Sequence, residues 1–150
     1  MVDRFDELLK SAGKSLGIPL HTDKHHACAI QVRHGIVVQL QSDVSQEKLL
    51  IASKVAEITP GKFRENVLRE ALKANGMADP RVGVFAYLSA TNHLVLFQYY
   101  PFDLLTGERL ANMLGPFTEA VEAWHNAIVA GRPAPPTVHP PGPHPFGLRP

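Results

Sequence analysis

Two adjacent histidines and the only cysteine of this 150-residue chain stand together in the segment DKHHACAI, residues 23 to 30. Cysteine and histidine are common zinc ligands, and a thiol beside an imidazole can also serve as an activated nucleophile. A structural zinc site needs a full tetrahedral set, usually from two close ligand pairs. No second cysteine exists, and the further candidates nearby are His21, Asp23 and His34.

Strand alternation argues against chemistry in this segment. If residues 26 to 33 form a strand, Cys28 shares a face with His26 while His25 points to the other face. Neighbouring strand residues cannot easily meet as nucleophile and base, and no orienting acid is evident. The sequence therefore favours a strand with a buried thiol, and we expect no metal, no cofactor and no catalytic residue. A small metalloenzyme that uses these three residues is the alternative.

Other signals of chemistry are weak. The letters GKS at 13 to 15 resemble the end of a phosphate loop, but that motif needs a glycine where Leu8 stands. With 15 basic and 14 acidic residues the net charge is +1, so no overall field attracts nucleic acid or an anionic membrane. A lone cysteine favours a reducing compartment such as the cytoplasm, and no apolar run reaches membrane-spanning length. We expect a soluble protein that is not exported.

The pattern of apolar residues predicts a helix at the start of the chain, between a capping Asp3 and a terminating Gly17. Strands are expected near 26–33, 36–41 and 48–56, with short links that imply antiparallel neighbours. The third run, KLLIASKVAEI, would also tolerate a helix, although its β-branched residues favour a strand. A second helix follows over TPGKFRENVLREALKAN.

Two β-rich runs, RVGVFAYLSA and NHLVLFQYYPF, form a predicted hairpin around Thr91 and Asn92. Both of its faces are apolar, which is unusual for a sheet that helices cover on one side only. Either three helices wrap both faces, or a second subunit or client chain completes the burial.

A last helix is expected from Asp103 or Thr106 to Gly131. Pro116 lies inside it, where proline removes one hydrogen bond and clashes with the carbonyl four residues back. We predict a kink or break at Gly115 and Pro116.

The element order predicts one α+β domain over residues 1–131. It has a single antiparallel β-sheet and three helices in the order α-β-β-β-α-β-β-α. Residues 132–150 contain 8 prolines among 19 residues, without apolar periodicity. We expect this segment to be an extended, disordered tail.

Several segments in this order resemble the Tir-chaperone (CesT) family, the class I chaperones of type III secretion. They are FDELLKSAGKSLGIP, LLIASKVAEI, LREALKANGM and HLVLFQYYPFDLLTGERLANMLGPFTEAVEAWHNAI. In that family a final strand runs into a proline, a short leucine-bearing turn and a long helix that ends with a tryptophan. The residues in those places are Pro101, Leu104, Leu110, Phe117 and Trp124.

The resemblance implies a cytoplasmic bacterial homodimer without enzymatic activity. Such a protein holds the amino-terminal segment of a secreted effector in extended form, soluble and ready for the secretion ATPase. The same fold in a non-secretory binding or regulatory module is the alternative. Two features depart from the family: its members are usually acidic, and the proline-rich tail is outside its pattern.

Carried over by position, the resemblance implies two surfaces. The implied client groove consists of Phe5, Leu8, Leu9, Ile30, Val32, Ile36 and Val38. The implied dimer interface consists of Val67, Ala71, Val82, Val84, Phe85 and Tyr87.

Overall fold

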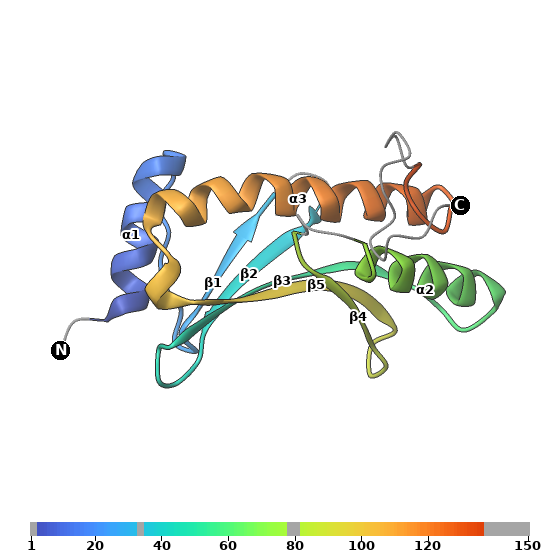
Figure 1. Ribbon diagram of the computed structural model, residues 1–150, viewed down its shortest axis with the longest axis horizontal. Helices are drawn as coiled ribbons and strands as arrows, with labels where there is room; N and C mark the ends of the chain where they lie inside the picture. Colours follow the sequence, from blue (N-terminus) through green and yellow to red (C-terminus); the bar gives the residue numbers. More distant parts are fainter. Residues whose placement is uncertain (1–2, 33–34, 78–81, 137–150) are drawn as a thin grey trace.

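The computed structural model describes residues 3–32, 35–77 and 82–136 (Figure 1). The predicted element order is confirmed, with one short 3-10 turn added before the last helix. The elements are α1 (Arg4–Leu16), β1 (Ala27–Gln31), β2 (Val37–Ser42), β3 (Lys48–Glu57), α2 (Lys62–Asn75), β4 (Val84–Leu88), β5 (His93–Pro101), η2 (Phe102–Leu104) and α3 (Gly107–Val129). The third run is therefore a strand and not a helix.

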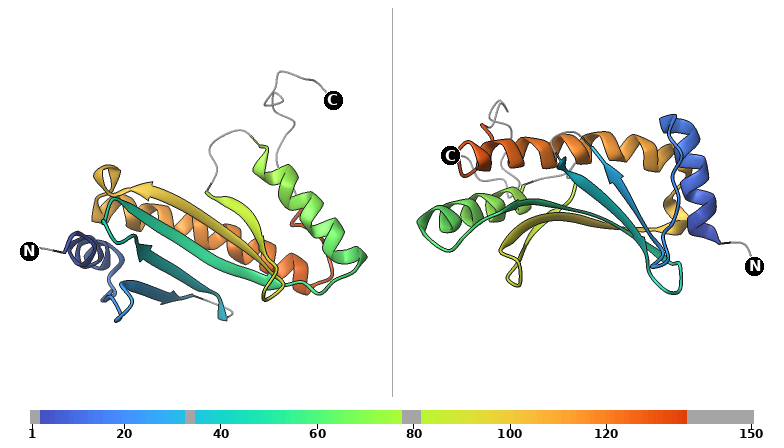
Figure 2. Two further views of the ribbon diagram at one scale, coloured as in Figure 1. Left: turned by 90° about the horizontal axis from the view of Figure 1, so that it is seen from below. Right: turned by 180° about the vertical axis from the view of Figure 1, so that it is seen from behind.

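The described strands make one antiparallel sheet in the order β1-β2-β3-β5-β4. The long strands β3 and β5 lie at its centre, while β1 and β4 are the two edges. All three helices lie on the same side of this sheet (Figures 1 and 2), so the alternative in which they wrap both faces is wrong. One face is covered by helices and is called the covered face; the other is called the open face.

The helix ends follow from local chemistry. The Asp3 side chain accepts hydrogen bonds from the amides of Phe5 and Asp6, and Gly17 ends α1 with a φ of 75°. Thr106 caps α3 in the same way, through Arg109 N–H. These caps fix where the apolar stripes of α1 and α3 begin, and therefore which side chains meet the sheet.

Alternation in the strands separates the two faces. Leu49, Ile51 and Val55 of β3 point into the core beneath α1 and α3, whereas Leu50 and Ala52 point to the open face. The same alternation holds in the neighbouring strands. The core residues it contributes are Val38, Leu40, Leu94 and Leu96.

The helix α3 runs unbroken from Gly107 to Val129, with Pro116 inside it, so the predicted break is wrong. Pro116 and Asn112, whose carbonyl it deprives of a hydrogen bond, both lie on the exposed side of the helix. Water can satisfy that carbonyl there, and Phe117 and Leu114 anchor the core side on either flank of the proline.

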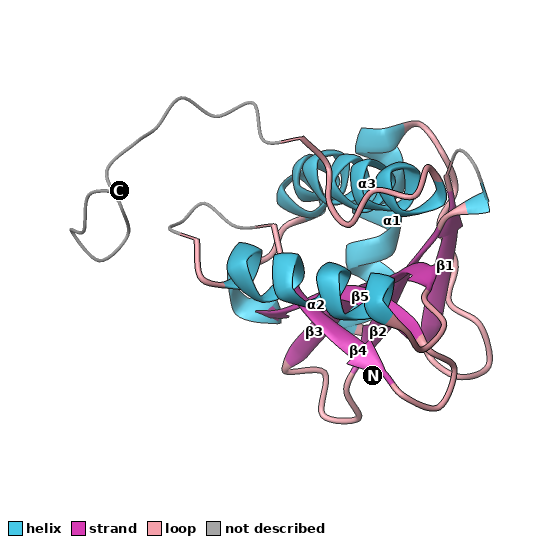
Figure 3. Ribbon diagram, turned by 90° about the vertical axis from the view of Figure 1, so that its right-hand side faces the viewer, coloured by secondary structure: helices cyan, strands magenta, loops and turns pink. Residues whose placement is uncertain are grey.

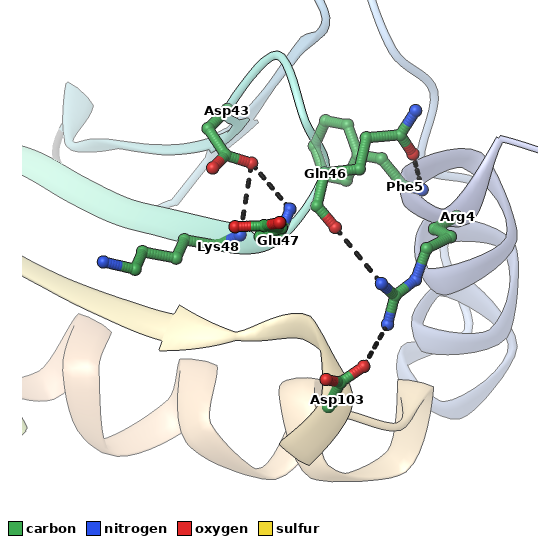
Figure 4. Close-up of polar contacts among 7 residues, drawn as sticks. All are labelled: Arg4, Phe5, Asp43, Gln46, Glu47, Lys48 and Asp103. Carbon is green, nitrogen blue, oxygen red and sulfur yellow. Dashed lines mark hydrogen bonds and ion pairs between the residues drawn. The ribbon is translucent and has the colours of Figure 1, made fainter.

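A polar corner joins the start of α1 to the turn between β2 and β3 and to η2 (Figure 4). The Arg4 guanidinium donates to the backbone carbonyl of Gln46 at 3.3 Å and to the Asp103 carboxylate at 2.8 Å. Asp43 closes the turn between β2 and β3 by accepting from the amides of Glu47 and Lys48. Those amide bonds, led by the one from Lys48, lower the pKa of the Asp43 carboxyl.

After α3 the chain has no helix or strand over 132–136. The rest of the predicted tail, residues 137–150, lies outside the described residues. None of the described helices is long and apolar enough to cross a membrane.

Candidate functional site

The segment that carries the histidines and the cysteine forms a turn and the start of the edge strand β1. The Asp23 carboxylate accepts from the amides of Ala27 and His25, and these bonds lower its pKa. His25 and His26 are exposed, whereas the Cys28 side chain is buried in the core, and burial raises its thiol pKa. Among the described residues no cluster of three or more His, Cys, Asp or Glu suited to a metal ion occurs.

The open face carries a concave hollow of about 550 Å³, which we call the face hollow. It spans the central strands and reaches toward β2 and β4, which lie side by side with them in Figure 3. Large apolar side chains on it are partly exposed: Tyr99 by 55%, Leu88 by 43% and Val37 by 39%. Its lining is Gly35, Val37, Gln39, Leu50, Ala52, Ser53, Lys54, Ala86, Leu88, Val95, Phe97 and Tyr99.

A second hollow of about 410 Å³ lies beside the edge strand β1 and is called the edge hollow. The end of α1, the strand β1 and the middle of α3 enclose it. Its apolar wall includes Leu16 and Ile18, which are 37% and 43% exposed. The whole lining is Leu16, Ile18, Ile30, Gln31, Val32, Val38, Leu114, Gly115, Thr118, Glu119 and Glu122.

The backbone at the β1 edge is open for pairing next to this hollow. Val32 N–H donates to the Ile36 carbonyl. Because hydrogen-bonded residues alternate along an antiparallel strand, Ile30 and Cys28 also direct their N–H and C=O groups toward β2. The residues between them, Ala29 and Gln31, therefore turn their N–H and C=O groups away from the sheet, and both are exposed. Each exposed edge strand of this kind can template a further strand.

The β4 edge differs because a side chain already pairs with it. Asn75 at the end of α2 accepts from Phe85 N–H at 2.8 Å and donates to Phe85 C=O at 3.0 Å. Its amide therefore takes the place of a neighbouring strand at that residue. Further along, Arg64 of α2 lies over the Tyr87 ring and donates to its hydroxyl.

The structure divides the predicted client groove. Ile30 and Val32 are half-buried and line the edge hollow together with Val38. The other predicted residues are packed in the core with less than a tenth of their surface exposed, and none of them lines the face hollow or the edge hollow. These residues are Phe5, Leu8, Leu9 and Ile36.

The predicted dimer residues divide in the same way. Val67 and Ala71 of α2 are buried within the protomer. The other four, Val82, Val84, Phe85 and Tyr87, are half-buried on and beside β4. The exposed apolar side chains near them are Leu72 (70%) and Met77 (53%), which sequence reasoning missed. Leu72 falls on the apolar stripe of α2, and nothing in its spacing distinguishes it from a core position.

Sequence reasoning also missed most of the edge hollow. Leu16 falls on the apolar stripe of α1 and Leu114 on that of α3, and such spacing is typical of core positions. Ile18 follows a glycine and gave no periodic signal. For the face hollow, the sequence did indicate that both faces of the hairpin are apolar, and strand alternation places Val95, Phe97 and Tyr99 on the open one.

Solved structures with a similar fold include a chaperone–effector complex and a type III secretion chaperone. A chain of the HopA1–SchA chaperone–effector complex matches with a TM-score of 0.66 at 21% identity, covering 85% of this chain and all (100%) of that one. The Yersinia pestis type III secretion chaperone SycH, in complex with a YscM2 fragment, matches with a TM-score of 0.60 at 18% identity, over 78% and 96% of the chains. The Pseudomonas aeruginosa ExoU–SpcU complex gives 0.59 at 15% identity, over 85% and 96%.

No curated protein matches the chain. The family model for the Tir chaperone protein (CesT) family matches residues 7–125, which include every strand and nearly all of the helices. The resemblance noted from the sequence is confirmed: the chain belongs to the Tir chaperone protein (CesT) family.

Proposed function

We propose that this type III secretion chaperone binds the amino-terminal segment of a secreted effector in extended form, along the β1 edge. The observation that carries this proposal is the open backbone of Ala29 and Gln31 beside the apolar edge hollow. An added strand gains main-chain hydrogen bonds from such an edge, and alternate side chains of the client enter the hollow. Ile30 and Val32 are the predicted client residues that such side chains can meet; Val38 lines the hollow but is only 1% exposed.

The remaining residues of the predicted client groove have a supporting role in this proposal. Phe5, Leu8, Leu9 and Ile36 belong to the packed core of the protomer. A client that contacted them would have to open the protomer, which costs buried apolar area. We therefore place the client contact on the surface layer above them.

We also propose that the protein is a homodimer, joined through α2 and β4. Leu72 and Met77 expose large apolar side chains there, and no residue of β4 is fully buried in the single protomer. A self-complementary apolar patch is what a two-fold symmetric interface requires. Burial by a partner subunit would cover Val82, Val84, Phe85 and Tyr87, above the core positions Val67 and Ala71.

The proposed activity needs no catalysis, no cofactor and no metal, only apolar surface complementary to an unfolded segment. We place the protein in the bacterial cytoplasm, where effectors are held before export. The secretion ATPase is the partner to which we expect the loaded complex to be passed. Neither nucleic acid nor membrane is needed.

The first experiment is the native mass of the protein purified gently from its own host, with any companion identified by mass spectrometry. We expect two copies of this chain with one copy of a larger secreted protein. A bare monomer would contradict both the dimer and the chaperone function.

An edge variant then tests the binding mode. In Ala29→Pro the missing N–H is one that points away from the sheet, so the fold is retained. We expect the effector to be lost or greatly weakened in co-purification, because the client strand loses its hydrogen-bond donor. Ala29→Ser keeps the N–H and is the matched control. Equal effector recovery with both variants would show that the client does not pair with β1.

A further inference from the structure

The two hollows differ in charge. Among the described residues that line the face hollow, Lys54 is the only charged one. Among those that line the edge hollow, the charged ones are Glu119 and Glu122 of α3. Among the described residues, each hollow thus combines a largely apolar lining with charge of one sign.

The hollows also differ in the backbone that they offer. The edge hollow adjoins the unpaired groups of β1, which suit an extended strand. In the face hollow the strands β3 and β5 are paired on both sides, so their backbone groups are already used. An extended chain lying there would leave its own N–H and C=O groups without partners against apolar side chains, which is costly. An occupant of the face hollow must satisfy its backbone internally, as an amphipathic helix does.

We propose that the two hollows select a client of opposite charges: basic residues flank the strand in the edge hollow, and an acidic residue flanks the helix in the face hollow. This rests on the proposed function, since both segments belong to the client. Lys54 faces an apolar surface with no acid in its lining, so an aspartate or glutamate of the client meets a cation without a competing anion. Charge complementarity of this kind fixes register and suppresses wrong partners more than it raises affinity.

The probes are two synthetic amphipathic helical peptides with the same leucines and alanines, one flanked by glutamate and the other by lysine. Their affinities for the full chain are measured by fluorescence anisotropy at low salt. We expect the acidic peptide to bind about two- to fivefold more tightly, the range that exposed ion pairs provide. High salt should remove this preference, because exposed charges are screened.

Charge reversal locates the effect. Lys54→Glu should invert the preference, so that the basic peptide binds more tightly. Lys48→Glu is the matched control: Lys48 lies on the same strand and is exposed, but it does not line the hollow, and the preference should be unchanged. Glu119→Lys should likewise leave the helical peptides unaffected, but weaken binding of a lysine-flanked strand peptide.

Three results would overturn the proposal. Equal affinities of the two helical peptides, or no binding of either, would show that the face hollow does not select charge. A change in oligomeric mass with Lys54→Glu would show that a second copy of this chain covers the open face. If the native-mass experiment meanwhile recovers an effector, only the charge selection fails; if it recovers none, the chaperone function fails independently.

Discussion

Leu50 and Ile51 are neighbours on β3, but their side chains point to opposite faces of the sheet and have different roles. Ile51 lies beneath the helices with 1% of its surface exposed, whereas Leu50 turns to the open face and lines the face hollow. Both are large and aliphatic, and only the strand alternation separates them. The comparison shows that apolar burial on the covered face stabilises the fold, while apolar residues on the open face are available for a partner. The two roles can therefore be changed independently.

The largest expected effect tests this separation directly. Ile51→Ala should lower the free energy of unfolding by about 2–5 kcal/mol, because it leaves a cavity in the packed core. Leu50→Ala should cost less than about 1.5 kcal/mol, since the open face is already in contact with water. Denaturant unfolding of both variants measures the difference. Equal losses would mean that the open face is as tightly packed as the covered one.

Two glycines of α3 sharpen the comparison within one helix. A methyl group at Gly107 would collide with Ser11 of α1, where the two helices approach closely, whereas Gly115 has open space around its Cα. Gly107→Ala should destabilise by about 1–3 kcal/mol through overpacking. Gly115→Ala should change the free energy of unfolding by less than about 1 kcal/mol, because the gain in helix propensity is opposed by the crowding that Pro116 imposes on the residue before it. Thermal unfolding of the two variants measures the difference.

The thiol offers a third comparison, between Cys28 on the covered face and Ala29 on the exposed edge. Burial raises the pKa of Cys28 above its ordinary value of 9.0, so folding favours the protonated form. The stability that this pKa shift contributes is fully present at pH values below 9.0 and is lost as the pH rises through the pKa of the folded protein. We expect iodoacetamide to modify native Cys28 more than about tenfold slower than a thiol at position 29.

The double variant Cys28→Ser with Ala29→Cys provides that exposed thiol. Mass spectrometry of timed samples at pH 8 measures both rates. Similar rates would place Cys28 within reach of solvent and would revive a reactive role for the DKHHACAI segment.

The smallest expected effect lies outside both faces, at the exposed corner of Figure 4. The Arg4 and Asp103 side chains are 48% and 87% exposed, and exposed ion pairs contribute about 0.2–1 kcal/mol. Asp103→Asn should reduce the free energy of unfolding by no more than this, and by less at high salt. A larger loss in urea unfolding would show that the corner, and not the covered face, holds α1 in place.

The sequence was sufficient to predict the helices, the strands and their apolar faces, because these follow from local periodicity. The apolar pattern between Asp3 and Gly17 predicted α1, and the hairpin was expected to carry apolar residues on both faces. The spacing could not say which apolar residues stay exposed. Phe5 and Leu72 both stand on apolar stripes, yet Phe5 is buried and Leu72 is 70% exposed, because tertiary packing decides burial.

Contacts between distant segments were also beyond sequence reasoning. The pairing of Asn75 with Phe85 depends on where α2 docks, and asparagine at a helix end normally indicates only a terminating residue. Pro116 misled for a related reason: proline predicts a lost hydrogen bond, but not that the freed carbonyl faces water. In both cases the local rule holds and the three-dimensional setting determines its outcome.

Asn75 has a consequence for how this protein can exist at high concentration. A chaperone must display adhesive surface for its client, and a sheet with two open edges would allow its own molecules to add to one another in ribbons. The amide of Asn75 occupies the backbone of Phe85, so β4 cannot serve as a continuous template at that residue. If only the β1 edge can accept a strand, pairing ends after one addition. The sheet can therefore bind a client strand without becoming the seed of an aggregate.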